Sequence, residues 1–325
     1  MTTSPNLSEI VTTTLRNRSK KLADNITNNN AILRKLNSKG NVSTFSGGRT
    51  IVQELEYATN TTYKRYSGYE ALDISPSDVF SAAEFNIKQA AVGITISGLE
   101  QLQNSGPNAV IDLLAARVKN GERTMQNGIT TDMYSDGTSS SSKQIGGLQL
   151  LVPVASATGT VGGINAANFS FWQNIAKTVS ALTIATGTGN VISTMQGVWV
   201  QLVRGNDGPD LIIQDNNHFT TYYTALQAQQ RFQNTDAAEG GFTSLMFNNV
   251  PVVLDGGVGT NCPTFTTYFL NTSYLFFRPH ADQNFVPIGD DRFSVNQDAM
   301  VKLIGWAGNM TVSNRRLQGI LSSTS

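Results

Sequence analysis

The clearest helical pattern in the sequence is the stretch PNAVIDLLAARVKNGERTMQNGITTDM, residues 107–133. Its apolar residues recur at spacings of four and seven, as one buried helix face requires: Val110, Leu114, Val118, Met125, Ile129 and Met133. Pro107 suits the first turn, where its missing amide hydrogen breaks no helical bond. A single helix roughly 40 Å long is therefore predicted. It ends before SDGTSSSSKQIGG (135–147), which breaks the pattern.

A long strand is predicted before this helix, over residues 84–97. Its apolar side chains change from odd to even positions along the segment: Phe85 and Ile87, then Val92, Ile94 and Ile96. Because alternate residues of a strand point to opposite faces, this change predicts a bulge or kink at residues 89–91.

Residues 49–70 are predicted to form a long hairpin with its turn at residues 59–62. This register places Glu56 opposite Arg65 and Leu55 opposite Tyr66. The hairpin also holds four of the nine tyrosines of the chain: Tyr57, Tyr63, Tyr66 and Tyr69. A two-stranded hairpin is marginally stable alone in water, and aromatic residues are enriched at protein interfaces. Docking on another surface and packing on its own domain both remain open for this segment.

The N-terminal region has the character of an arm. Residues 1–40 carry seven basic and two acidic residues, a net charge of +5. The apolar stripe of residues 5–38 is too sparse to predict a core helix. The segment GNVSTFSGG (40–48) is predicted to be a flexible connection at the end of the arm. We expect this arm to pack on another surface.

The second half mixes short helical and strand patterns and shows no internal repeat. Helices are predicted at residues 171–179 and 192–202 and from Phe219 onward, and a strand at 211–214. Two hairpins are predicted at residues 245–254 and 268–277. A last strand pair is predicted near residues 300–306 and 310–318.

Composition and motifs favour a structural role over catalysis. Charged residues make up only 14% of the chain and the formal charge is zero, against about a quarter charged in typical proteins. A surface rich in uncharged polar groups suits a protein covered by neighbours, because amides and hydroxyls cost less to bury than charges. The single cysteine, Cys262, excludes an internal disulfide and fits a reducing cytosol. No secretion signal and no membrane span is predicted.

Candidate chemical sites are few. His218 and His280 stand outside any metal-ligand spacing, and the acidic pairs at 132/136 and 290/291 read as solvated carboxylates. No phosphate loop or nucleophile elbow occurs, and the glycine-rich GTVGGINAAN (159–168) reads as a linker. We therefore predict no enzymatic activity, no cofactor and no metal. A hydrolase built from a serine, His218 and an aspartate in an unrecognised arrangement is kept as an alternative.

The order of these elements resembles that of the tailed-phage major capsid family, whose fold is named after the Hong Kong phage. Stretches such as GFTSLMFNNVPVVLD (241–255) and RRLQGIL (315–321) resemble C-terminal sequences of that family. The resemblance implies an α+β fold with five parts: an N-terminal arm (1–48), an extended loop hairpin (49–72), a peripheral domain with a spine helix (73–150), an axial domain (151–255) and C-terminal strands that return to the peripheral domain (256–325).

The resemblance also implies a function. Subunits would assemble into pentamers and hexamers of an icosahedral head that encloses double-stranded DNA without sequence-specific binding. Portal and possibly scaffold or decoration proteins would be partners; the location would be the virion, with assembly in the bacterial cytoplasm. Inter-subunit contacts are expected at two groups of residues, in the arm and in the extended loop: Arg16, Arg18, Lys20, Lys21, Tyr57, Tyr63, Lys64, Arg65, Tyr66 and Tyr69.

Two alternatives of other kinds stay open. An encapsulin, a bacterial shell that holds a cargo enzyme, would share the fold, and its protein cargo would distinguish it from a shell filled with DNA. A phage tail or surface-layer protein would share the polar composition but lack the single long helix.

Overall fold

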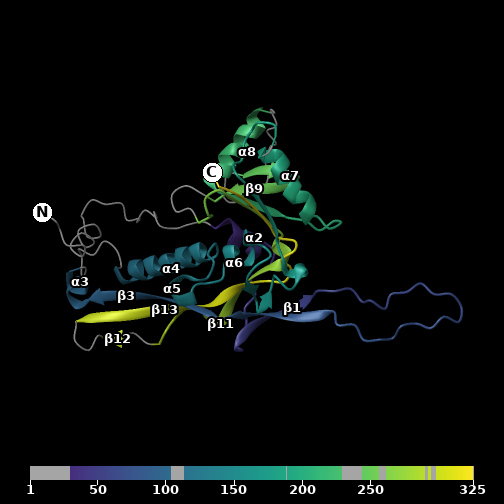
Figure 1. Cartoon of the computed structure of the whole chain (residues 1–325). Helices are drawn as coiled ribbons and strands as arrows, with labels where there is room; N and C mark the ends of the chain where they lie inside the picture. Colours follow the sequence, from purple (N-terminus) through teal and green to yellow (C-terminus); the bar gives the residue numbers. More distant parts are fainter. Residues whose placement is uncertain are drawn as a thin grey trace.

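The computed structural model describes residues 30–103, 113–187, 189–228, 244–255, 261–289, 292–293 and 298–324. The predicted α+β class is confirmed. One long sheet carries a long helix along its face, and a second sheet of six strands is covered by two shorter helices (Figure 1). None of the helices in these described ranges is long and apolar enough to cross a membrane.

The long sheet pairs strands from both ends of the chain. β3 (Lys88–Ser97) pairs antiparallel with β13 (Ala299–Val312), which also pairs with β11 (Leu275–Pro287) and β12 (Arg292–Phe293). Helix α4 (Leu113–Asp132) lies along β3. The predicted helix is thus confirmed over most of its length, whereas its predicted start at 107–112 falls outside the described residues.

A close approach of helix and strand explains one glycine in α4. A Cβ atom added at Gly121 would lie 2.9 Å from Cδ1 of Ile94 on β3. Met125 and Ile129, one and two turns further along the helix, are buried against the same core. The described part of the apolar stripe, from Val118 to Met133, therefore packs as its spacing predicts.

The predicted strand at 84–97 is two strands in two sheets. β2 (Phe80–Asn86) pairs with β1 (Thr50–Glu56), whereas β3 pairs with β13. The break falls at Ile87, before the predicted residues 89–91. The side-chain pattern changes because the chain leaves one pairing partner for another.

The predicted hairpin register is wrong. β1 pairs with β2, so that Glu56 lies opposite Phe80 and Leu55 opposite Ser81, in place of Arg65 and Tyr66. Residues 57–79 form no strand and project away from the body as a long loop, called the extended loop below (Figure 1). The tyrosine-rich segment resembles a strand more than β2 does, since residues 81–83 of β2 (FSAAEFN) are small.

The six-stranded sheet has the order β6-β14-β10-β7-β9-β8. Its strands are β6 (Ile175–Val179), β7 (Leu211–Gln214), β8 (Ser244–Phe247), β9 (Val250–Leu254), β10 (Thr266–Leu270) and β14 (Gly319–Ser323). Helices α7 (Val191–Leu202) and α8 (Asn216–Ala228) pack on it around a second apolar cluster. The helix at 192–202, the strand at 211–214, the helix from Phe219 and the hairpin at 245–254 are confirmed.

Four other sequence predictions are wrong. The segment 171–179 is a short turn, η2 (Ser170–Trp172), followed by strand β6 instead of a helix. The hairpin at 268–277 does not form, because β10 and β11 belong to different sheets and are joined by η3 (Thr272–Tyr274). The pair near 300–318 is the single strand β13 followed by β14. The glycine-rich linker forms a small hairpin of β4 (Thr160–Val161) and β5 (Ile164–Asn165).

Part of the predicted arm belongs to the core. Helix α2 (Ala31–Ser38) buries Ile32 and Leu36 completely. Asn30 caps this helix, its Oδ1 accepting from the amide of Ile32 at 2.8 Å. Residues 41–45 then pair with β11. The expectation that the stripe is too sparse for the core is therefore wrong for residues 31–38, because two fully buried side chains suffice to seat one short helix. Residues 1–29 lie outside the described part.

The remaining α-helices within the described residues are short: α3 (Gly98–Gln103), α5 (Ser139–Ser142) and α6 (Leu148–Leu151).

Candidate assembly surface

The base of the extended loop is fixed by an aromatic contact. The ring of Tyr57 stacks on Phe171, with centroids 5.2 Å apart and planes at 27°. Phe171 in turn contacts Phe169 and Trp172. The amide of Tyr57 donates to the carbonyl oxygen of Val79 at 3.0 Å, which closes the neck of the loop. These contacts hold both ends of the loop against the body.

The small β4–β5 hairpin supports the same base from β2. The carbonyl oxygen of Gly162 accepts from the amide of Glu84 at 3.0 Å. Gly162 has φ +59°, and an added Cβ would lie 2.8 Å from the Cβ of Ala83. Only glycine therefore permits this approach without strain. The same hairpin is also held by Trp172, whose Nε1 donates to the carbonyl oxygen of Val161 at 2.9 Å.

Beyond its base, the extended loop makes only local polar contacts within the described residues. Lys64 pairs with Glu70 at 3.2 Å, both about half exposed. Oδ1 of Asn60 accepts from the amide of Thr62 at 2.9 Å. The side chain and amide of Ser75 donate to Asp73 and hold the pKa of that carboxyl below its ordinary value. Such exposed contacts shape short turns and stabilise little, at most about 1 kcal/mol for an ion pair.

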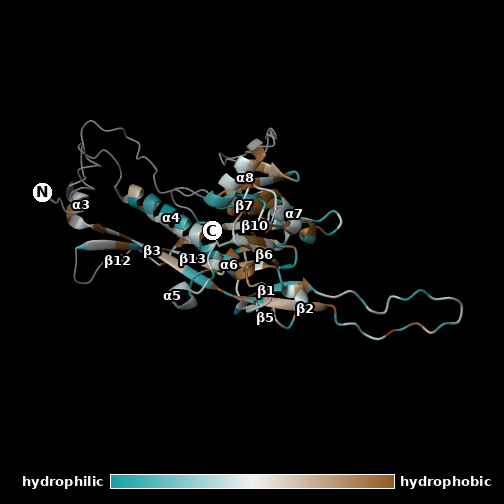
Figure 2. Ribbon diagram, turned by 45° about the horizontal axis from the view of Figure 1, so that its top comes forward, coloured by the Kyte–Doolittle hydropathy of each residue, from teal (hydrophilic) through white to brown (hydrophobic). Residues whose placement is uncertain are grey.

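The extended loop projects away from the body (Figure 2), and several of its large apolar side chains are exposed. Tyr63 is 80% exposed and Ile74 is 92% exposed. The others are Tyr66, Tyr69, Leu72 and, where β2 begins, Phe80. Single exposed apolar residues are common on protein surfaces, but several of them within one projecting segment make that segment a candidate binding surface.

The structure brings half of the expected contact residues together. Tyr63, Lys64, Arg65, Tyr66 and Tyr69 all lie in the extended loop and are exposed. Tyr57 contacts its own subunit through Phe171, and Glu56 does not face Arg65. The four basic residues expected in the arm, Arg16, Arg18, Lys20 and Lys21, lie outside the described residues. Whether any of these residues contacts another subunit stays a prediction.

Sequence reasoning missed the apolar second limb of this loop. The sequence analysis predicts no contact role for Leu72, Ile74 or Phe80, which are exposed in the structure. The available signal was ALDISPSDVF (71–80), where apolar residues stand among polar ones in a segment with no other strand signal. Phe171 was assigned to a helix and its contact with Tyr57 could not be foreseen, since the two lie far apart in the chain.

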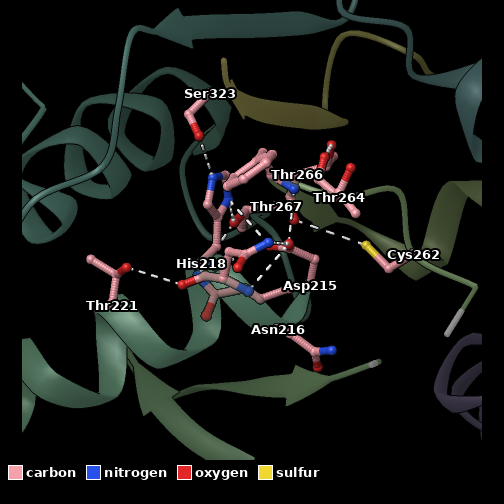
Figure 3. A network of polar contacts seen from close by, with 12 residues as sticks. Asp215, Asn216, His218, Thr221, Cys262, Thr264, Thr266, Thr267 and Ser323 are labelled. Carbon is pink, nitrogen blue, oxygen red and sulfur yellow. Dashed lines mark hydrogen bonds and ion pairs between the residues drawn. The ribbon is translucent and has the colours of Figure 1, made fainter. Parts of the chain in front are cut away.

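A buried polar network under α8 is the strongest candidate for chemistry (Figure 3). Nε2 of His218 lies 2.9 Å from Oγ of Ser323, and Nδ1 lies 2.9 Å from Oγ1 of Thr267. Oδ1 of Asp215 accepts from the amide of His218 at 3.0 Å, and Oδ2 accepts from the amide of Phe265 at 2.8 Å. The network joins α8 to the strands β10 and β14.

This arrangement does not match a hydrolase triad. Asp215 Oδ1 is 3.9 Å from Nδ1 of His218, whose nearer partner is Thr267, whereas a triad requires the carboxylate to orient the imidazole. Ser323 is only 7% exposed, so its hydroxyl is shielded from a substrate. Burial lowers the pKa of His218 and so favours a neutral imidazole, although the charge of Asp215 acts in the opposite direction. We conclude that the network is structural.

No metal cluster is found in the described part of the chain either. Within the described ranges, no three histidine, cysteine, aspartate or glutamate side chains gather as ligands. Cys262 is buried, and burial raises the pKa of its thiol well above the ordinary value, which suits an inert side chain. The acidic pair at 290/291 lies outside the described residues.

Comparisons with known structures identify the fold. A chain of the cyanophage A-1(L) capsid superposes with a TM-score of 0.64 at 17% identity, covering 96% of this chain and 98% of that one. A chain of the bacteriophage PhiM1 mature capsid gives 0.57 at 11% identity, covering 96% and 92%. This chain has the tailed-phage capsid fold. The resemblance seen in the sequence is therefore confirmed at the level of the fold.

The capsid fold also occurs in a compartment of another kind. The holo-SrpI encapsulin complex of Synechococcus elongatus superposes with a TM-score of 0.56 at 7% identity, covering 97% of this chain and 94% of that one. Scanning protein-family models and searching curated protein sequences give no match. At these identities the likeness concerns the fold alone, and the boundaries of the five expected parts stay predictions.

Proposed function

We propose that the chain is a major capsid protein, which assembles into pentamers and hexamers of an icosahedral head around double-stranded DNA. The extended loop is the observation that carries this proposal. It is a feature of a fold shared with phage capsid chains, and it places exposed tyrosines and Ile74 beyond the reach of its own core.

A closed shell needs contacts in which one patch of each subunit meets a different patch of the next. Such contacts can each be modest, because a lattice engages many at once. A loop whose apolar groups are uncovered in the free subunit suits this role, since burying a tyrosine at an interface can contribute on the order of 1–2 kcal/mol. The expected loop contacts Tyr63, Lys64, Arg65, Tyr66 and Tyr69 follow from this argument.

The proposal extends to partners and place. A chain with no net charge encloses DNA without binding it tightly, and the basic residues Arg16, Arg18, Lys20 and Lys21 screen phosphates or meet acidic protein surface. Portal and possibly scaffold or decoration proteins complete the particle. The protein acts in the virion after assembly in the bacterial cytoplasm. It catalyses no reaction and holds no cofactor.

An encapsulin is the second candidate, favoured by the likeness to the SrpI complex. The two differ in content: shells filled with DNA support the capsid, and shells filled with a protein cargo support the encapsulin. A tail or surface-layer protein is disfavoured by the 20-residue α4, which such a protein was expected to lack.

Replacement of the extended loop tests the proposal. Tyr57 and Val79 are hydrogen-bonded neighbours, so an Asn-Gly turn in place of residues 58–78 closes β1 onto β2 as a tight hairpin. We expect the free subunit to melt at the parent temperature, and negative-stain microscopy and sedimentation to detect no shells. Intact shells from this variant would refute the role of the loop. Insoluble, misfolded subunits would instead place the loop in the subunit's own core.

A further inference from the structure

An open groove of about 370 Å³ lies between α2, α4 and β11. Its size falls at the lower end of typical ligand sites. Its floor is apolar and one wall carries polar groups from the exposed face of α4. The lining residues are Leu33, Ile129, Phe277, Phe285, Glu122 and Gln126.

The backbone of β11 is distorted where it contributes to this groove. Phe285 has φ +58°, a conformation that bulky residues rarely adopt. The pairing of β11 with β13 shifts register on both sides of Asn284, as at a bulge. Bulges redirect side chains, and residues held in strained conformations concentrate at binding sites. Here the distortion places an aromatic ring, 36% exposed, in the groove.

The chain enters the described region beside this groove. Nδ2 of Asn30 donates to the carbonyl oxygen of Thr130 at 3.4 Å and contacts Sδ of Met133 at 3.5 Å. Asn30 therefore lies against the last turn of α4, next to Ile129 at one end of the groove. The residue that precedes Asn30 is therefore attached at this end of the groove.

The preceding segment has side chains suited to the groove. Leu22 and Ile26 stand eight and four residues before Asn30, at helical spacing. As a helix, the eight residues from Leu22 to Asn30 span roughly 12 Å, which is comparable to the advance of about 10 Å along α4 from Glu122 to Ile129, and an extended chain would reach further. Both apolar side chains can therefore reach the groove from Asn30.

Charge favours the same occupant. Glu122 is exposed on the groove wall and makes no ion pair within the described part of the chain. Residues 1–29 carry four basic and two acidic residues, with the basic group at Arg16, Arg18, Lys20 and Lys21. Leu22 and Ile26 in the groove would leave this basic group on the side of Glu122.

We propose that residues 1–29 dock in the groove of their own subunit, with Leu22 and Ile26 against Ile129 and Phe285 and the basic group beside Glu122. This docking is a property of the free subunit and does not depend on shell formation. It keeps the apolar residues of the segment away from solvent until another surface competes for them.

Disulfide trapping in purified, unassembled subunits tests the docking. Thr27→Cys is combined with Gln126→Cys in the groove or, as control, with Thr124→Cys, which is exposed two residues away on α4. The native Cys262 is buried and does not compete. We expect the groove pair to form an intramolecular disulfide roughly tenfold faster, because docking raises the effective concentration of the two thiols. Equal rates, or covalent dimers in place of intramolecular links, would overturn the proposal.

A second measurement uses the strained residue. Phe285→Gly removes the ring and suits the positive φ, so the subunit keeps its melting temperature. We expect trypsin to cleave at residues 16–21 several times faster in this variant, as mass spectrometry of the N-terminal fragments would detect. Val286→Ala, at the neighbouring exposed position, is the matched control. Unchanged cleavage in Phe285→Gly would exclude the groove as the docking site. Neither assay involves shells, so both stand apart from the proposed function.

Discussion

Tyr57 and Phe171 stack with ring centroids 5.2 Å apart, although one begins the extended loop and the other precedes strand β6. The contact joins the neck of the loop to the part of the chain that leads into the six-stranded sheet. The loop is thus a projection whose base is fixed by this pair.

The first prediction concerns that base. Tyr57→Ala removes the stack, and we expect slower assembly with aberrant shells while the melting temperature falls by only a few degrees, because Tyr57 is partly exposed. Tyr57→Phe keeps the ring and should assemble like the parent. Light scattering during assembly and microscopy of the products measure both. Normal shells from Tyr57→Ala would show that the stack does not direct the loop.

The second prediction separates the apolar from the charged side chains of the extended loop. Tyr66→Ala and Ile74→Ser should each weaken assembly by about 1–2 kcal/mol per contact and leave subunit stability unchanged, since both side chains are exposed. Lys64→Ala breaks the exposed pair with Glu70 and should matter less. The critical subunit concentration for assembly is the quantity to compare. A larger effect from Lys64→Ala would mean that charge, and not apolar burial, drives docking.

The third prediction divides the N-terminal region at Asn30. Leu36→Asp buries an unpaired charge in the core and should cost several kcal/mol of folding free energy. Deletion of residues 1–29, which precede α2, should leave a folded subunit that assembles poorly. Denaturant titration followed by circular dichroism measures the folding of both variants, and negative-stain microscopy measures the assembly of the deletion variant. A stable Leu36→Asp subunit would place α2 outside the core.

The fourth prediction concerns Asp255, which lies beside Tyr134 and Cys262. Its Oδ2 is buried without a hydrogen-bond partner among the described residues. Burial raises the pKa of this carboxyl above its ordinary value of 3.8, with a smaller opposite effect of the Tyr134 hydroxyl. As the pH rises above 3.8 the unfolded chain loses the proton first, so the folded state loses stability until its own carboxyl ionises.

Asp255→Asn removes this titration. We expect the variant to be more stable than the parent at neutral pH and the difference to vanish near pH 4. Urea unfolding across this range gives the comparison, and Asp282→Asn at an exposed position is the control. Parallel pH profiles for Asp255→Asn and the parent would show that folding does not raise the pKa of Asp255.

Local patterns predicted the elements whose neighbours lie nearby in the chain. The stripe through Met125 and Ile129 gave α4, and the turn at Asn248 and Asn249, both with positive φ, gave the β8–β9 hairpin. The elements that failed depend on distant partners. Ile175 starts a strand because β14 pairs beside it, and no spacing within 171–179 reveals that partner.

The candidate surface was predictable in part for the same reason. Tyr63, Tyr66 and Tyr69 stand out by type in a polar segment, so their exposure could be anticipated. The second limb was hidden, because its extent depends on Glu56 pairing with Phe80. The groove was beyond sequence reasoning, since Leu33, Ile129 and Phe285 come from three separate elements.

The pairing of β3 with β13 has a consequence for how the subunit is made. β3 leaves the ribosome when most of the chain is still to be translated, and its partner is among the last segments synthesised. Until then β3 has an unpaired edge and α4 covers an incomplete sheet. A polypeptide that stops before residue 299 cannot complete the long sheet. Protein synthesis must therefore reach β13 before the long sheet of a subunit can form.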